Sequence, residues 1–505
     1  MKMKNVFLLM FFIILEINAN FLHFQFIRSL QSQSTNEYDY SSYTATSKNT
    51  NLNGQTLTSS TSDQSVVYIT QSGITITNSI LQKTGGDSSN TENSEFYGVN
   101  AAVLVNGGGV TITDGEITTA AKGGNAVCAT NNGVVTISGT TISSTAESSG
   151  RGLHATYGGS ITASKVTISS TGGSCATLAT DRGEGTVTCT DCTLSTAGAG
   201  SPLIYSTGTI SISGTTGTSS GAQMVVVEGR NTATVENSSL KCTGVGNRNN
   251  VDKSGIMLYQ SMSGDADSGT STFNCKSSTM EILSSSTVYD SAPMFFITNT
   301  EASINLENCT FTYGSGVFLD AEGTSAWGTS GSNGGTVTLK LTNQNIEGDF
   351  VIDSSSTLAV TMVNSTMKGK INNSKNSATI SITLDSASNI ILTGDSYISS
   401  LNNSDSTGSN IVKGSYSFED YNGNAYTATG SESSEATTTS PSTTSAPTTS
   451  PSTTSAPTTP SLTTTPVSSS GNDNNSTYDH WIRVNSNNYI SYSILLCLIN
   501  ILLLN

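Results

Sequence analysis

Charged residues are scarce in this chain of 505 residues, since Asp, Glu, Lys and Arg together make up only 11% of it. Histidine occurs 3 times, tryptophan 2 times, and hydrophobic residues make up 34%. The 36 acidic residues outnumber the 20 basic ones, so the net charge is −16. Nucleic-acid binding needs clustered Lys and Arg, and this balance argues against it. It also argues against acidic polymers such as pectate unless a metal bridges them. Most of the surface must therefore be neutral and polar.

A short phrase is repeated along the middle of the chain. It reads Gly-x-Val-Thr-Ile-x-x-x-x-Ile-x-Ser and recurs about every 25 residues. A unit of this length cannot close a hydrophobic core alone, so the copies must stack into a solenoid. The clearest copies begin at Gly109, Val134, Ser160, Gly185, Thr209, Ser303 and Gly335.

Each copy has the alternation of a β-strand. In Val110-Thr-Ile-Thr113 the Val and Ile point one way and the threonines the other. Beyond the turn, another apolar residue lies seven positions after the first apolar residue of each strand, as in Val110 with Ile117 and Val135 with Ile142. Another short apolar strand precedes each copy, as in 101–105 and 224–227. We predict an all-β chain whose residues 56–428 form one elongated parallel β-helix of about a dozen or more rungs, right-handed by the rule for parallel crossovers.

The two ends of the chain carry targeting signals. Lys2 and Lys4 precede an apolar run at 6–15, and Ala19 offers a cleavage site, so we expect residues 1–19 to be a secretory signal peptide and 20–55 an N-terminal cap. An apolar run at 494–504 closes the chain without a following Lys or Arg. Small residues precede it across a polar spacer, which predicts GPI attachment at Asn475 and removal of 476–505. A tail-anchored single span is the alternative.

Residues 429–475 have a different composition. Six of the chain's 8 prolines lie between Pro441 and Pro466, among Ser and Thr. Such a segment cannot form a core and is typical of a disordered, O-glycosylated stalk. We expect the stalk to hold the solenoid at the outer face of the plasma membrane or in the cell wall, with the GPI lipid as the membrane contact.

Seven of the cysteines lie in the repeat region. Cys189 and Cys275 take the place of an inward Ile, so buried, stacked thiols are favoured. Disulfides between rungs are the alternative, because secretion permits them. The Cys189-x-x-Cys192 spacing has no second pair that would complete a zinc site.

Asn-x-Ser/Thr motifs predict N-glycosylation candidates at Asn237, Asn308, Asn364, Asn372, Asn402 and Asn474, with Asn475 also matching. Among them Asn308 is disfavoured, because its neighbour Cys309 is a candidate core residue.

Acidic residues near the same turn of successive rungs are the best catalytic candidates. Asp181 and Glu228 lie about two rungs apart, or about 9–10 Å, near the upper carboxylate separation of inverting glycosidases. His154, one rung earlier, is a candidate general base. Exposed turn charges and a turn histidine are the simpler interpretation, and we expect no catalytic residue.

Two longer loops offer binding candidates. Asp265 and Asp267 could ligate Ca²⁺, but no third acidic ligand is evident, so neither a metal nor a cofactor is predicted. Trp327 with Tyr157 and Tyr259 would suit stacking on sugar rings, with Asp181 and Arg182 as polar contacts. A Trp327 folded back onto the barrel is the alternative.

Outward threonine pairs suggest a third kind of surface. Thr75 with Thr77 and Thr111 with Thr113 resemble the flat arrays of ice-binding solenoids. The array decays into Ser, Asn, Glu and Lys further along the chain, which favours ordinary β-propensity on a wettable face.

Several phrases outside the repeat resemble adhesin-like right-handed parallel β-helix proteins, which have a pectin-lyase-like fold. They are 151–159 (RGLHATYGG), 179–183 (ATDRG), 257–266 (MLYQSMSGDA), 327–335 (WGTSGSNGG) and 392–397 (LTGDSY). The resemblance covers roughly residues 60–420 and implies a secreted or surface protein of a microbe. No pectate-lyase-type acid cluster accompanies it, so no catalytic residue is carried over.

We therefore expect a GPI-anchored, non-enzymatic, adhesin-like surface protein that binds glycans or cell-wall polymers. A polysaccharide lyase or glycoside hydrolase is the first alternative, and an ice-binding solenoid the second. Fold class alone does not decide among them.

Overall fold

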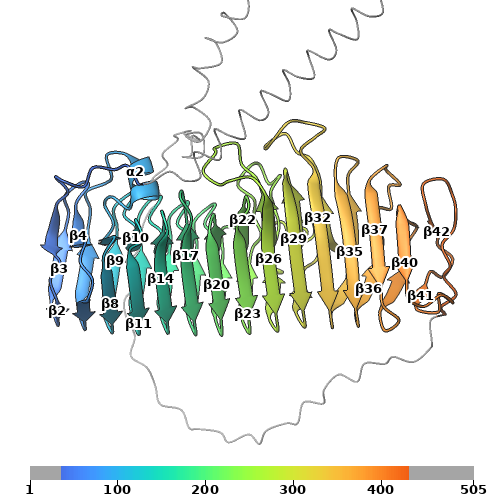
Figure 1. Ribbon diagram of the computed structural model, residues 1–505, viewed down its shortest axis with the longest axis horizontal. Coiled ribbons are helices and arrows are strands. Elements are labelled where there is room, and N and C mark those ends of the chain that lie inside the picture. The colour runs from blue at the N-terminus through green and yellow to red at the C-terminus, as the bar shows by residue number, and fades with distance from the viewer. Residues whose placement is uncertain (1–35, 432–505) are drawn as a thin grey trace, which may run out of the picture. The chain divides into compact units, whose positions relative to one another are not determined.

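The computed structural model describes residues 36–431. In this part of the chain the fold is a right-handed parallel β-helix, as predicted, with a single helix, α2 (Thr91–Tyr97). Figure 1 shows the strands stacked side by side along one axis. Three long parallel sheets run along that axis, and we call them sheets A, B and C.

Sheet A has 12 strands, one from each successive rung. In stacking order they are β1 (Ala45–Lys48), β4 (Ser65–Ile69), β7 (Val103–Asn106), β10 (Val127–Thr130), β13 (Leu153–Ala155), β16 (Leu178–Thr180), β19 (Ile204–Ser206), β22 (Val225–Glu228), β25 (Ile256–Tyr259), β28 (Phe295–Thr298), β31 (Val317–Ala321) and β34 (Asp349–Ile352).

Sheet B is the longest, with 14 strands. They are β2 (Leu52–Asn53), β5 (Ile74–Thr77), β8 (Gly109–Thr113), β11 (Val134–Ser138), β14 (Gly159–Ser164), β17 (Gly185–Thr190), β20 (Thr209–Ser213), β23 (Thr232–Glu236), β26 (Thr270–Lys276), β29 (Thr300–Glu307), β32 (Gly335–Thr342), β35 (Thr357–Val363), β37 (Thr379–Leu384) and β40 (Ser400–Asn403).

Sheet C has 10 strands, and two small sheets continue the stack at its C-terminal end. Sheet C contains β3 (Thr56–Ser59), β6 (Ile80–Lys83), β9 (Glu116–Thr119), β12 (Thr141–Ser144), β15 (Thr167–Ser170), β18 (Thr193–Thr196), β21 (Thr216–Ser219), β24 (Ser239–Cys242), β27 (Thr279–Ile282) and β30 (Thr310–Thr312). The small sheets contain β33 (Asn345–Glu347), β36 (Thr366–Gly369), β38 (Asn389–Leu392) and β41 (Ile411–Val412), and β39 (Ser396–Tyr397) with β42 (Phe418–Glu419).

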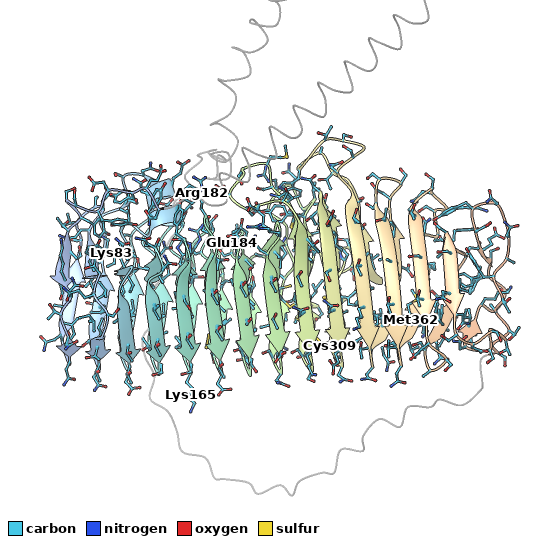
Figure 2. All side chains as sticks on the ribbon, in the orientation of Figure 1. Lys83, Lys165, Arg182, Glu184, Cys309 and Met362 are labelled. Atoms are coloured by element: carbon cyan, nitrogen blue, oxygen red, sulfur yellow. A yellow bond between two sulfur atoms is a disulfide. The ribbon has the colours of Figure 1, made fainter. Side chains whose placement is uncertain are left out.

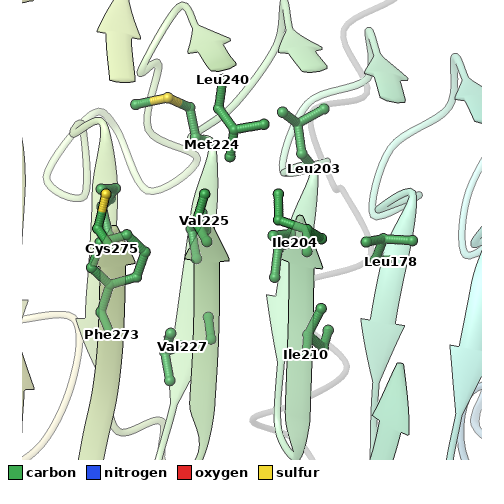
Figure 3. Packing of buried hydrophobic residues seen from close by; sticks show 14 of the residues in the cluster. Leu178, Leu203, Ile204, Ile210, Met224, Val225, Val227, Leu240, Phe273 and Cys275 are labelled. Carbon is green, nitrogen blue, oxygen red and sulfur yellow. The ribbon is translucent and has the colours of Figure 1, made fainter. Parts of the chain in front are cut away.

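The core is a set of apolar ladders along the axis. Val110, Val135 and Ile161 occupy the same register position on neighbouring strands of sheet B, and all three are buried. Figure 3 shows the same alignment for Leu178, Ile204 and Val225 of sheet A. Each buried aliphatic side chain stabilises the stack by about 1.5–3 kcal/mol relative to exposure. The predicted pairing of Val135 with Ile142 is confirmed, since both point into this core.

The first rung starts earlier than predicted. β1 and β2 already pair with β4 and β5, so the solenoid begins at Ala45 instead of residue 56. The sequence signal is weak here because β1 is threonine- and serine-rich and has no fully buried residue. The predicted signal peptide, nearly all of the stalk, Asn474, Asn475 and the GPI signal lie outside the described residues.

Four cysteines form disulfides, contrary to the favoured prediction of stacked thiols. Cys275 pairs with Cys309, which joins two neighbouring rungs, and Cys189 pairs with Cys192 across one turn. Cys189 reaches the second residue of the turn that follows its own strand, β17. Cys275 in β26 reaches the same turn position one rung further along, after β29. Cys128, Cys175 and Cys242 remain buried free thiols.

Candidate functional site

Insertions in the repeat gather at the two edges of sheet A. The segments that lead into sheet A include 84–102, which contains α2, and 243–255, and those that leave it include 260–269 and 322–334. The turn that leaves each strand of sheet B, in contrast, has two residues from β2 to β35. In Figure 1 the insertions rise above the upper ends of the strands, while the lower edge is even between β8 and β29. The outer face of sheet A is therefore the face that the chain elaborates.

Arg151 lies at the centre of a buried charge cluster on this face. Its Nη2 lies 3.3 Å from Oδ2 of Asp181 and 3.7 Å from Oε1 of Glu95 in α2. Asp181 directly follows β16 and is only 1% exposed, so it is not the solvated turn charge that the sequence suggested. Burial raises the pKa of Asp181 to about 8, and the Arg151 guanidinium opposes that shift. The cluster ties α2 to the strands beneath it.

His154 lies within β13 and is fully buried, so the prediction of a turn histidine is wrong. Its Nδ1 is 3.8 Å from Sγ of Cys128 on the neighbouring strand. Burial, helped by the nearby Arg151 charge, lowers the pKa of His154 well below its usual value. Burial also raises the pKa of the Cys128 thiol to about 12. The pair is thus a neutral imidazole beside a protonated thiol, which is an unreactive arrangement at neutral pH.

Glu228 ends β22, two strands along sheet A from the strand that precedes Asp181, as the sequence predicted. Its Oε2 accepts hydrogen bonds from the hydroxyls of Tyr205 and, at 2.7 Å, of Tyr259. Burial raises the pKa of Glu228, and hydrogen bonds from Ser261 and the two tyrosines oppose the shift. Glu228 is 2% exposed, so it too is a buried group and not a surface charge.

A set of ion pairs lies above these buried groups, and we call it the charged rim: Arg182, Glu184, Arg230, Asp265 and Asp267. The side chain of Asp265 is buried at 5% exposure, and the others are partly exposed or exposed. Nη2 of Arg230 lies 3.0 Å from Oε1 of Glu184 and 2.8 Å from Oδ2 of Asp267. Arg182 pairs with Asp265. The side chains of Arg230 and Glu184 are 49% and 50% exposed. In Figure 2, Arg182 and Glu184 lie at the upper edge of the strands, beside the insertions.

The loop aspartates therefore face arginines. Asp265 and Asp267 are each neutralised by a guanidinium, an arrangement that does not suit a cation. Within residues 36–431, no group of three or more His, Cys, Asp or Glu side chains could hold a metal ion. The guanidinium of Arg182 also lies 3.8 Å from the ring centroid of Phe96, which links the 260–269 insertion to α2.

The aromatic candidates are buried, which corrects the expectation of exposed stacking rings. Trp327 is 6% exposed and packs edge-on against Tyr259, with 5.2 Å between ring centroids. It also joins Phe296 in a small apolar cluster, so the folded-back alternative is the one observed. Tyr157 stacks on Tyr97 at 5.6 Å. These rings fasten the insertions to sheet A.

Sequence reasoning missed three residues that organise the site. Arg151, Glu95 and Tyr205 were not singled out, because their partners come from insertions or other rungs whose folding has no repeat signal. The one available sign was that charge is rare, which made Arg151, two residues before a strand, unusual.

Several buried polar atoms on this face make no hydrogen bond. Nη1 of Arg151, Nε2 of His154 and Oγ1 of Thr207 are buried without a hydrogen-bond partner. Such atoms are usually satisfied by water or a ligand. The face therefore combines a charged rim with a polar interior below it.

No protein-family model, curated protein or solved structure matches this chain. Within the described residues, no helix has the length and apolar character needed to cross a membrane.

Proposed function

We propose that this protein is a non-enzymatic, adhesin-like β-helix that a GPI anchor and a Ser/Thr/Pro stalk display at a cell surface. We further propose that it binds glycans or cell-wall polymers at the outer face of sheet A. One observation carries the proposal: among the three faces within residues 36–431, only this one has long insertions at both of its edges together with a cluster of charged and aromatic side chains. In solenoids, insertions on one face commonly mark the binding face.

The chemistry of the charged rim suits sugar hydroxyls. Arg182 and Arg230 present several fixed donors each, and Glu184 and Asp267 present acceptors beside them. Ion pairs of this kind can exchange partners with a hydroxyl-rich ligand without leaving a charge unpaired. The outer faces of sheets B and C, by comparison, carry mainly Thr and Ser around the same rungs.

The test is binding of the secreted full chain to a glycan array and to insoluble polysaccharides. Arg182→Ala and Arg230→Ala should each weaken binding about tenfold or more, equivalent to about 1.4 kcal/mol. Lys241→Ala is the matched control, because Lys241 also forms an exposed ion pair, 2.7 Å from Glu281, but on sheet C. Equal binding by all three variants, or binding to no glycan, would contradict the proposal. Trp327→Ala and Tyr157→Ala are poorer tests, because both rings are buried supports of the insertions.

A hydrolase or lyase is the competing function on the same face. The observation in its favour is the spacing of two carboxyls. Asp181 follows β16, Glu228 is the last residue of β22, and these strands lie two positions apart in sheet A. Both carboxyls are buried, and Glu228 is held by two tyrosine hydroxyls. Released reducing ends or unsaturated sugars in the same incubations, abolished by Asp181→Asn, would establish this alternative.

Ice binding is supported by two in-register arrays of Thr and Ser, one on sheet B and one on sheet C. On sheet B the outward threonines of five consecutive strands are in register, namely Thr75, Thr111, Thr136, Thr162 and Thr188. Sheet C carries the second array. Thr141 and Ser143, Thr167 and Ser169, and Thr193 and Ser195 are in register on three consecutive strands. Thermal hysteresis of the purified protein, lost on Thr167→Tyr, would favour this function over adhesion.

A further inference from the structure

The corner between sheets B and C, which β33 and β36 of the small sheet continue toward the C-terminal end, repeats one backbone conformation. The first residue of its two-residue turn has a positive φ in rung after rung, for example 53° at Lys165 and 48° at Ser277. Its side chain points to solvent, while the second residue is buried, as at Ser238 and Ser278. Asn and Gly adopt this left-handed conformation most easily, which explains why Asn is frequent here.

Three of the N-glycosylation motifs begin at this position. Asn237 follows β23, Asn308 follows β29 and Asn364 follows β35, with φ values of 47°, 53° and 47°. These strands alternate with β26 and β32 in sheet B, so the three asparagines lie every second rung along one line. With about 4.8 Å per rung, neighbouring sites are about 10 Å apart. All three residues are exposed. Nδ2 of Asn364 donates to Oδ1 of Asn343 at 2.8 Å, but both side chains are exposed and leave room for a glycan.

We propose that Asn237, Asn308 and Asn364 carry N-linked glycans that form a single row along this corner. The inference rests on the secretory part of the proposed function. The disfavoured site, Asn308, is as exposed as the other two, because only its neighbour Cys309 turns inward. In Figure 2, Cys309 lies at the lower edge, on the opposite side of the strands from Arg182.

The same geometry excludes Asn372. This residue is 1% exposed, and its Nδ2 donates to the carbonyl of Asn376 at 3.0 Å and to the hydroxyl of Tyr421 at 3.2 Å. A glycan on that nitrogen would displace both contacts and would have no room. Asn402 is exposed but lies within β40, outside the row.

The row would cover the part of the solenoid farthest from the proposed binding face. In a three-sided coil, the corner between sheets B and C lies opposite sheet A. Bulky sugars at this corner would hide part of sheets B and C while leaving the charged rim uncovered.

The experiment is site-by-site occupancy of the full chain produced in eukaryotic secretory cells. Peptide-N-glycosidase treatment in ¹⁸O water, followed by mass spectrometry, marks each occupied asparagine. We expect most molecules to be modified at Asn237, Asn308 and Asn364, and essentially none at Asn372. Lys165→Asn should add one further glycan, because it completes the motif with Val166 and Thr167 at the same exposed corner. Combining it with Thr167→Ala removes the motif and should abolish that gain.

The outcomes separate the row from the surface-display proposal. If the chain is secreted and Lys165→Asn gains a glycan while the three native corner sites stay empty, the row alone is refuted. Occupancy at Asn372 in folded protein would overturn the premise that burial decides which motifs are modified. If the chain stays inside the cell with every motif empty, including the added one, both the row and the proposed surface display fail.

Discussion

Arg151 shows how much a single buried charge can matter in a chain with little charge. Its guanidinium is shared by Glu95 and Asp181, and removal would leave two carboxyls in a buried setting without a counter-charge. We expect Arg151→Ala to lower the free energy of unfolding by about 3–5 kcal/mol. The exposed pair of Lys241 should contribute at most about 1 kcal/mol. Denaturant unfolding of both variants would check this, and equal losses would count against the cluster as a structural element.

The buried Asp320 in β31 should make the stability of the folded protein depend on pH. Burial, reinforced by Glu322 and Asp353 and opposed by Lys253, raises its pKa to about 7. The folded protein therefore holds a proton that the unfolded chain has released above about pH 4. Stability from this group is complete at low pH and declines as the pH rises toward about 7.

We accordingly predict a lower Tm at pH 8 than at pH 5, with a smaller difference in Asp320→Asn. The neutral amide keeps the shape of the side chain but does not ionise. Asp181 and Glu228 act in the same direction, and the buried His154, whose pKa is lowered, acts in the opposite one. The part of the difference that remains in the variant is the balance of these groups. An unchanged difference would show that Asp320 does not titrate in this range.

The roles of individual residues were the part least accessible from the sequence. Asp181, Tyr157 and Trp327 were predicted to lie in turns or loops, and each lies in a connection that leaves sheet A. Their burial was not predictable, since it depends on insertions that have no period and whose contacts, such as Glu95 with Arg151, span several rungs.

The turn between sheets B and C is the element on which regular stacking depends. At Ser277 the φ of 48° is costly for a β-branched residue and free for glycine. Ser277→Val should lower stability by about 1–2 kcal/mol, whereas Ser277→Gly should change it little. Thermal unfolding of the pair would test this, and similar Tm values for both variants would contradict the left-handed assignment.

The two disulfides should differ in their contribution to stability. Cys275–Cys309 closes a loop with a sequence separation of 34, and Cys189–Cys192 one of 3. If chain entropy dominates, the longer loop is stabilised by about 4 kcal/mol and the shorter by about 1.5 kcal/mol. Replacing each pair by Ala and comparing denaturant midpoints would check the order. A larger loss from the short loop would contradict it.

The elements themselves were largely predictable. Alternation in Val110-Thr-Ile-Thr113 and the apolar residue Ile117 located strands of sheets B and C, because a parallel coil imposes the same inward positions on every rung. Prediction failed at β1, where no buried residue marks the strand. It also failed for the cysteines, whose pairing depends on turn geometry that alternation does not encode.

The stack as a whole should open from its ends. Central strands such as β14 and β17 have a neighbour on each side, whereas β1 and β40 are outermost in their sheets. Amides of the central strands should therefore exchange hydrogen most slowly, followed by the terminal rungs, with 260–269 and 322–334 fastest. Hydrogen exchange followed by mass spectrometry would establish the order, and uniform protection along the axis would contradict it.

The restriction of insertions to the edges of sheet A has a practical consequence. A foreign peptide placed between β25 and β26 enters a connection that already departs from the repeat, so the register of the flanking rungs is kept. The same peptide at the corner after β23 would break a turn that neighbouring rungs share. The molecule thus provides a scaffold for loop grafting in which the permissive and the forbidden positions lie on opposite sides.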